Sequence, residues 1–122
     1  MTPDPTAEPA AAPPARRSGP LAGVRVLDLT AVVLGPLATQ ILGDWGADVI
    51  KVEPVAGDST RRLLGAGAGF FPMFNRNKKS IALDLRRPEG LEVARKLAAS
   101  ADVVAQNFKP GVMTKYGLDY AA

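Results

Sequence analysis

Two short apolar segments flank a longer amphipathic one near the start of the patterned region. Residues 24–29 (VRVLDL) and 47–53 (ADVIKVE) are rich in branched apolar residues and are bounded by turn-forming ones, which predicts two buried strands. Between them, Leu37, Ile41 and Trp45 recur at a spacing of four residues, and this spacing predicts a helix with one apolar face. We expect Trp45, which lies on that face, to be part of the core.

A strand, a helix and a strand in such close succession predict a βαβ unit with parallel strands and a right-handed connection. Residues 80–85 (SIALDL) and 102–105 (DVVA) predict two further strands, with a helix over 88–99 between them. The expected fold class is therefore α/β, with a Rossmann-like parallel sheet and flanking helices. Residues 21–122 contain no element that closes the sheet, so we interpret them as the incomplete N-terminal part of a larger fold.

The first twenty residues differ in composition, with six prolines, five alanines and no periodicity. Such a segment cannot bury enough apolar area to offset its ordering entropy, so residues 1–20 are predicted to be a disordered tail. They also lack the basic start and the apolar stretch of a secretory signal. No apolar run in the chain approaches the length that crosses a bilayer, and we expect a cytoplasmic protein without a membrane partner.

Composition excludes several mechanisms. The 122 residues contain 15 Lys and Arg against 12 Asp and Glu, a net charge of +3, which is too mild to indicate a nucleic-acid partner. The chain has no cysteine and no histidine, so it cannot form a thiolate nucleophile, a cysteine-ligated zinc site or a Ser-His-Asp triad. We expect no metal, and any nucleophile must be a carboxylate, a lysine or a hydroxyl.

Ligands of open parallel sheets collect beyond the carboxyl ends of the strands. In this chain the predicted ends are the loops 30–36, 54–60, 86–88 and 106–111. The first loop offers backbone N–H groups around Gly35 at a helix N-terminus, which is a natural anion site. Arg86 and Lys109 lie in two of the other loops. We therefore expect a polar, anionic ligand at this edge of the sheet.

A nicotinamide-dinucleotide site is a competing interpretation of the first βαβ unit. Glu53 ends the second strand, where a ribose-binding acid belongs. However, the turn after the first strand reads TAVVLGP rather than G-x-G-x-x-G. The valine and leucine side chains there would hold a pyrophosphate away from the backbone, so the pattern disfavours a dinucleotide site.

Most of the remaining charged residues are interpreted as solvated. Arg61, Arg62 and Lys78 lie in segments without sustained periodicity and are expected to be exposed loop charges. Asp58 is expected at the surface or in a turn. Asp28 lies inside the first predicted strand, where a capping role and a ligand contact are open alternatives.

Three spaced segments carry a resemblance to a known family. They are VRVLDLT with GPLATQILGDWGADVIKVEP and GDSTR, then FNRNKKSIALDLRRPEG, and then ADVVAQNFKPGVMTKYGLDY. In this order they resemble the N-terminal part of the family III (CaiB/BaiF-type) CoA-transferases, a group that includes formyl-CoA and carnitine CoA-transferases and the related α-methylacyl-CoA racemases. The resemblance runs from about Leu21 to Tyr120. It is specific for the family and says little about the substrate.

The resemblance implies that residues 21–122 are the truncated N-terminal part of the large domain of a CoA-transferase that works as an intertwined homodimer. The ligand would be coenzyme A (CoA), bound as an acyl-CoA substrate, with a carboxylic acid as acceptor. By position in the family motifs, the CoA contacts would be Val33, Leu34, Leu83, Asp84, Leu85, Arg86, Asn107, Phe108, Lys109 and Lys115. Pro54 stands where formyl-CoA transferases carry an arginine, which weakens an assignment to formyl-CoA.

The mechanism that the resemblance implies uses an aspartate that lies downstream of the N-F-x-P-G loop. Its carboxylate attacks the acyl-CoA thioester, and a mixed anhydride and an enzyme thioester follow. No aspartate of this chain matches that position, so we assign no catalytic residue and expect the isolated chain to be inactive. The alternatives are a non-catalytic truncated fragment with residual CoA binding and a racemase-type acyl-CoA enzyme of the same family.

Overall fold

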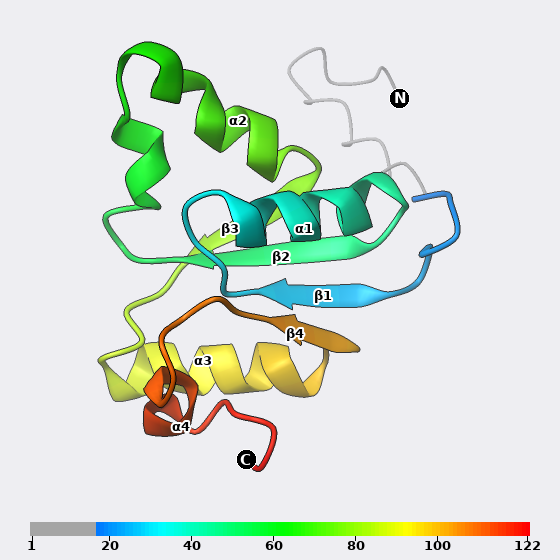
Figure 1. Ribbon diagram of the computed structural model, residues 1–122. Coiled ribbons are helices and arrows are strands. Elements are labelled where there is room, and N and C mark those ends of the chain that lie inside the picture. Colours follow the sequence, from blue (N-terminus) through cyan, green and yellow to red (C-terminus); the bar gives the residue numbers. More distant parts are fainter. Residues whose placement is uncertain (1–16) are drawn as a thin grey trace, which may run out of the picture.

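The computed structural model describes residues 17–122, which form a parallel sheet between two layers of helices (Figure 1). The strands are β1 (Arg25–Asp28), β2 (Asp48–Glu53), β3 (Lys78–Ala82) and β4 (Val103–Ala105). The helices are α1 (Leu34–Asp44), α2 (Phe70–Asn75), α3 (Pro88–Ala99) and α4 (Val112–Tyr116), with the short 3₁₀ helices η1 (Ser59–Arg62) and η2 (Gly65–Gly69) before α2. No helix within residues 17–122 is long and apolar enough to cross a membrane.

The sheet has the strand order β3-β2-β1-β4, and every neighbouring pair is parallel. This confirms the predicted α/β class and the βαβ unit. The third strand begins earlier than predicted, because it pairs with β2 over residues 78–82 rather than running from 80 to 85. Asp84 and Leu85 consequently lie beyond the carboxyl end of β3, and only the N–H of Leu83 still donates to β2, to the carbonyl of Glu53 at 2.9 Å.

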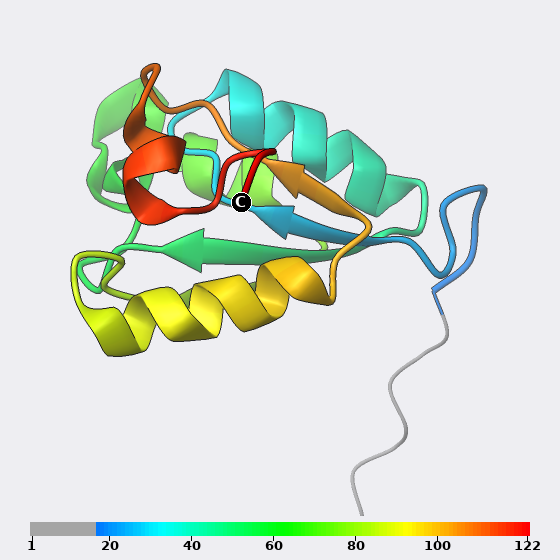
Figure 2. The same ribbon diagram turned by 90° about the horizontal axis from the view of Figure 1, so that it is seen from below.

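The two faces of the sheet differ in chemistry. Figures 1 and 2 show α3 and α4 on one face and α1 and α2 on the other. Under α3 and α4, Leu27, Leu29, Val52 and Met113 form the larger apolar cluster, against which Leu97 of α3 packs. Burial of these side chains supplies the main hydrophobic stabilisation of the fold.

The face under α1 and α2 changes from apolar to ionic along the strands. Val26, Ala47 and Val49 form a small apolar cluster there. Two residues further along the strands, Asp28 of β1 stands beside Lys51 of β2 in the parallel register, and both residues are at most 1% exposed. The charged positions lie toward the carboxyl ends of the strands, where the loops begin.

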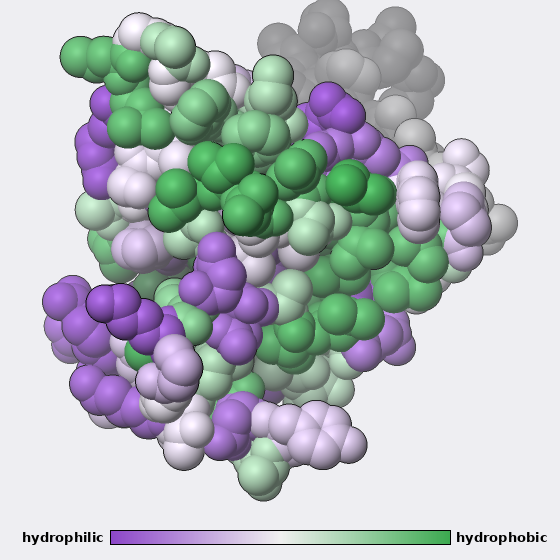
Figure 3. Space-filling model, in the orientation of Figure 1, coloured by the Kyte–Doolittle hydropathy of each residue, from purple (hydrophilic) through white to green (hydrophobic). Residues whose placement is uncertain are grey.

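Helix α1 is rotated about its axis relative to the prediction, so that the side opposite to its apolar stripe faces the sheet. It buries Pro36, Thr39, Gln40 and Gly43. Trp45 is 54% exposed, so its predicted place in the core is wrong, and Figure 3 shows the exposed apolar residues gathered over α1 and α2. The reason is the ionic surface beneath the helix. Thr39 Oγ1 donates to Asp28 Oδ2 at 2.7 Å, and the carbonyl of Pro36 accepts from Lys78 Nζ at 3.0 Å.

The folded chain includes residues that precede Leu21. Arg17 donates to the carbonyl of Ala47 at 2.9 Å, and Gly19 packs so closely that a Cβ atom would lie 2.5 Å from the carbonyl oxygen of Trp45. Arg17 and Gly19 of the predicted tail therefore contact the turn between α1 and β2. Residues 1–16 of that predicted tail lie outside the described residues.

Gly90 allows the first turn of α3 to contact the loop after β3. A Cβ atom at this position would lie 2.3 Å from the carbonyl oxygen of Asp84. We expect Gly90→Ala to separate the helix from the loop and to destabilise the protein by about 1–3 kcal/mol, the usual range for overpacked sites. Gly69→Ala is the matched control, because its Cβ would meet no atom within 4 Å. Equal thermal midpoints of both variants by circular dichroism would contradict the prediction.

Candidate functional site

A cavity of about 800 Å³ lies beyond the carboxyl ends of the strands. Its walls come from the segments that follow β1, β2, β3 and β4, so regions far apart in the sequence meet here. This is the edge at which ligands of open parallel sheets bind. The lining residues are Leu29, Thr30, Ala31, Val52, Pro54, Val55, Ala56, Gly57, Asp58, Ser59, Arg62, Leu83, Asp84, Leu85, Arg86, Phe108 and Tyr116.

The base of the cavity is apolar. Leu29 and Val52 belong to the buried cluster under α3 and α4, and Leu83, Leu85 and Phe108 pack against that cluster. These lining side chains are therefore anchored in the core of the protein. A concave apolar base with a few polar groups around it is typical of a small-molecule site.

The loop between β1 and α1 forms one wall and is clamped from the loop after β4. The N–H of Ala31 donates to Asn107 Oδ1, and Asn107 Nδ2 donates to the carbonyl of Ala31, each at 2.9 Å. Val32 lies at φ 73°, a left-handed conformation that β-branched residues rarely adopt. A Cβ atom at Gly35 would lie 2.5 Å from Thr30 Cβ, so the loop also packs tightly on itself. The clamp holds this wall in a single strained shape.

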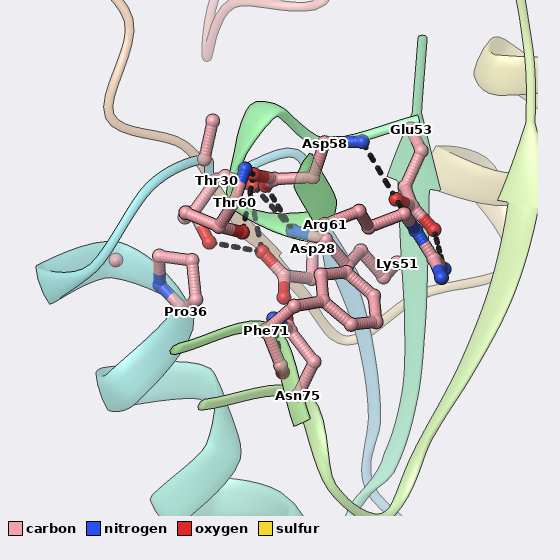
Figure 4. A network of polar contacts seen from close by, with 12 residues as sticks. Asp28, Thr30, Pro36, Lys51, Glu53, Asp58, Thr60, Arg61, Phe71 and Asn75 are labelled. Carbon is pink, nitrogen blue, oxygen red and sulfur yellow. Dashed lines mark hydrogen bonds and ion pairs between the residues drawn. The ribbon is translucent and has the colours of Figure 1, made fainter. Parts of the chain in front are cut away.

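Lys51 ties this loop to the loop after β2. Its buried Nζ donates to the carbonyl of Thr30 at 2.8 Å and pairs with Asp58 Oδ2 at 3.2 Å (Figure 4). Burial opposes ionisation of Asp58, but hydrogen bonds from Thr60 and the charge of Lys51 hold its pKa below the usual value. Asp58 is 3% exposed, so of its two predicted places the surface is wrong, and the residue caps η1 at the end of the loop. One ammonium group thus fixes the distance between two walls of the cavity.

A second ion pair lies between the sheet and α1. Lys78 Nζ is 2.8 Å from Asp28 Oδ2, and both side chains are at most 1% exposed. Asp28 also accepts from the hydroxyls of Thr30 and Thr39, while Lys78 donates to Asn75 Oδ1 at 2.9 Å. Burial lowers the pKa of Lys78. The expectation that Lys78 is a solvated loop charge is therefore wrong, and Asp28 anchors the wall of the cavity without lining it.

Glu53 organises the segment that carries η1. Its carboxylate accepts from Arg61 Nε at 2.8 Å, from Arg61 Nη2 at 2.7 Å, from the N–H of Asp58 at 2.8 Å and from the hydroxyl of Ser80. Arg61 Cζ also lies 3.7 Å from the ring centroid of Phe71. The Arg61 hydrogen bonds are the main cause that lowers the pKa of Glu53 to about 2. Both carboxylate oxygens are occupied within the fold, which argues against a ribose contact and a dinucleotide site.

Two arginines line the cavity. Arg86 donates to Asp84 through Nε at 2.9 Å and through Nη2 at 3.1 Å, and this pairing lowers the pKa of Asp84. Arg62 donates to the carbonyl of Ala56. The cavity therefore combines an apolar base with guanidinium groups in its walls, which suits a ligand that has both apolar and anionic parts.

Half of the residues assigned by the family resemblance line this cavity. The lining members are Leu83, Asp84, Leu85, Arg86 and Phe108. Asn107 lies at the same edge, with both polar atoms of its amide bonded to Ala31. The remaining four, outside the lining, are Val33 and Leu34 at the start of α1 and the exposed Lys109 and Lys115 in and near α4.

Sequence reasoning did not single out Asp58, Arg62 or Tyr116 as lining residues. The loop 54–60 follows the carboxyl end of a predicted strand, and this position could have pointed to Asp58. Arg62 lies at the end of η1 and Tyr116 at the end of α4. Neither follows a strand directly, so only the folding of these short helices toward the sheet brings them to the cavity.

The fold and the cavity define an α/β protein with a ligand-sized cavity at the carboxyl edge of a parallel sheet. Residues 21–122 match the sequence profile of CoA-transferase family III. The succinyl-CoA:glutarate CoA-transferase of Mus musculus is 49% identical over 106 residues, which are 83% of this chain and 24% of the relative. The formyl-CoA:oxalate CoA-transferase of Afipia carboxidovorans is 49% identical over 105 residues, with coverages of 82% and 25%.

A solved structure agrees with these sequence matches. The crystal structure of a CaiB/BaiF family protein from Brucella suis superposes with a TM-score of 0.79 at 46% identity, over 86% of this chain and 30% of that one. The chain belongs to CoA-transferase family III, which confirms the family resemblance. It spans about a quarter of the length of the curated relatives named above.

The pKa of Glu53 predicts a specific loss of stability in acid. Because folding lowers this pKa from 4.5 to about 2, the carboxylate stabilises the fold above pH 4.5, and this contribution disappears as the pH falls toward 2. We expect the difference in unfolding free energy between wild type and Glu53→Gln, measured by urea denaturation, to be largest above pH 4.5 and to shrink below it. Arg61→Gln should move the acid loss to higher pH. A difference that does not change with pH would contradict this assignment.

Lys51→Met tests the buried pair between the two walls. The substitution leaves Asp58 buried without its cation, and breaking a buried pair in this way costs about 3–5 kcal/mol. Adding Asp58→Asn should recover part of the loss, because an asparagine can still accept from Thr60 and carries no charge. Urea denaturation of the single and double variants measures both effects. Wild-type stability of Lys51→Met would show that the pair does not hold the walls together.

Proposed function

We propose that this chain is the CoA-binding part of an enzyme that transfers CoA from an acyl-CoA donor to a carboxylic acid. The observation that carries the proposal is the cavity at the carboxyl edge of the sheet, with an apolar base and arginines in its walls, in a chain that belongs to CoA-transferase family III. The donor and acceptor named for the relatives differ, so the proposal extends to acyl-CoA and carboxylic acids as classes.

The chemistry of CoA fits the two kinds of surface in the cavity. CoA has an adenine ring and a pantetheine arm with apolar methylene and methyl groups between its amides, and these apolar parts suit the base formed by Leu29, Val52 and Phe108. Its phosphate groups carry about four negative charges near neutrality, and guanidinium groups bind phosphates through charge-assisted hydrogen bonds. Val33, Leu34, Asn107, Lys109 and Lys115 remain proposed contacts from the family motifs, beside the lining residues.

The proposed reaction proceeds through an aspartate in polypeptide that continues beyond residue 122. Its carboxylate attacks the thioester carbon and the C–S bond breaks. This step releases CoA as the thiolate and leaves a mixed anhydride of the aspartate and the donor acid. The thiolate then attacks the aspartyl carbonyl, which forms an enzyme thioester and releases the donor acid as its carboxylate. The acceptor carboxylate then attacks the enzyme thioester and releases the CoA thiolate, which forms a second mixed anhydride. The thiolate attacks the acyl carbon of this anhydride, which gives the new acyl-CoA and regenerates the aspartate. In this scheme the described residues bind and orient CoA.

We also propose that the active protein is a cytoplasmic homodimer with intertwined subunits, as the family resemblance implies. The apolar side chains exposed on α1 support an interface of this kind. Leu34, Ile41 and Trp45 are 78%, 41% and 54% exposed, and contiguous apolar patches on a protein surface typically mark interaction sites.

Binding of CoA to the chain tests the proposed function directly. Isothermal titration calorimetry should show saturable binding of CoA and no binding of NAD⁺. Arg86→Gln should weaken CoA binding about tenfold, the lower end of the roughly 1.5–3 kcal/mol that a charge-assisted hydrogen bond contributes, because Arg86 must loosen its pairing with Asp84 to bind an anion. A chain that is folded by circular dichroism and binds no CoA would overturn the proposal, and binding of NAD⁺ would restore the dinucleotide interpretation.

A further inference from the structure

The charges that line the cavity are not all paired. Asp58 is bonded to the buried Lys51 at 3.2 Å, and Asp84 holds Arg86 through two hydrogen bonds. Within residues 17–122, Arg62 has no carboxylate partner and only the carbonyl of Ala56 as a hydrogen-bond acceptor. Arg62 is therefore the lining cation whose charge no described carboxylate balances.

The segment that carries Arg62 is held in place by hydrogen bonds and ion pairs of its neighbouring residues. Asp58 caps η1 by accepting from the N–H of Thr60 at 2.9 Å and from its hydroxyl at 2.7 Å. The neighbouring Arg61 is bonded to Glu53 and lies over the ring of Phe71, as Figure 4 shows. Two consecutive arginines thus differ in role. Arg61 secures η1 to the sheet, and Arg62 lines the cavity from a backbone that is already fixed.

We propose that Arg62 binds a phosphate group of CoA and is a main determinant of affinity for the phosphorylated end of this ligand. The inference rests on the proposed function and adds to it a residue that the family motifs did not assign. Arg86 must give up part of its bidentate contact with Asp84 to bind an anion. Arg62 gives up one hydrogen bond to a neutral carbonyl. Because less interaction free energy is lost when Arg62 leaves its partner, Arg62 should contribute more to phosphate binding than Arg86 does.

Calorimetric titration of Arg62→Gln with CoA tests the inference. We expect the dissociation constant to rise about tenfold to a hundredfold, more than for Arg86→Gln. The ratio of the dissociation constants of variant and wild type should shrink at high ionic strength because salt screens exposed charges. Arg62→Lys, which keeps the charge, should retain part of the affinity. Arg87→Gln is the matched control, since Arg87 pairs with Glu89 outside the cavity lining, and it should bind CoA like the wild type. The four proteins should have the same thermal midpoint.

Titration with dephospho-CoA, which lacks the 3′-phosphate, identifies the phosphate involved. If Arg62→Gln weakens CoA binding and leaves dephospho-CoA binding unchanged, Arg62 binds the 3′-phosphate. If both ligands lose affinity equally, it binds the diphosphate. Wild-type affinity of Arg62→Gln for CoA, in a chain whose wild type binds CoA, would overturn this inference and leave the proposed function intact. A wild-type chain that does not bind CoA would overturn both.

Discussion

The buried ammonium of Lys51 is the constraint on which the site depends. A lysine that is 1% exposed cannot keep its charge without partners, and in this fold the partners are the carbonyl of Thr30 and the carboxylate of Asp58. These groups belong to the loops after two neighbouring strands. The requirement to neutralise one charge therefore sets the distance between two walls of the cavity.

The two faces of the sheet contribute differently to the stability of the fold and to the positions of the loops. The face under α3 and α4 is an apolar cluster, which stabilises the fold and anchors the apolar lining residues Leu83, Leu85 and Phe108. The face under α1 and α2 contains ion pairs whose removal from water costs free energy. Hydrogen bonds to the charged groups offset this cost only when donors and acceptors lie in defined positions. The ionic face thus gives up stability for a single loop geometry, which a binding site needs before its ligand arrives.

Much of the fold could be predicted from the sequence, since it follows from local patterns. The apolar segments 24–29 and 47–53 contain β1 and β2, and the predicted helix over 88–99 is α3. The location of the site at the carboxyl edge follows from the parallel order of the strands. The partners of individual charges could not be predicted, because Asp28 and Lys78 are 50 residues apart in the chain. Only the register of the sheet and the packing of α1 bring such charges together.

The orientation of α1 shows what amphipathicity alone leaves undetermined. The spacing of Ile41 and Trp45 correctly indicates that the helix has two different faces, but it does not say which face meets the sheet. In an ordinary core the apolar face would. Here the sheet presents Asp28 and Lys78, and Thr39 and the carbonyl of Pro36 satisfy them. Asp28 lies inside a predicted strand, but Lys78 lies before the strand predicted over 80–85, so the ionic surface under α1 becomes evident only from the observed register of β3. Leu34 and Ile41, on the apolar side of α1, consequently stay exposed.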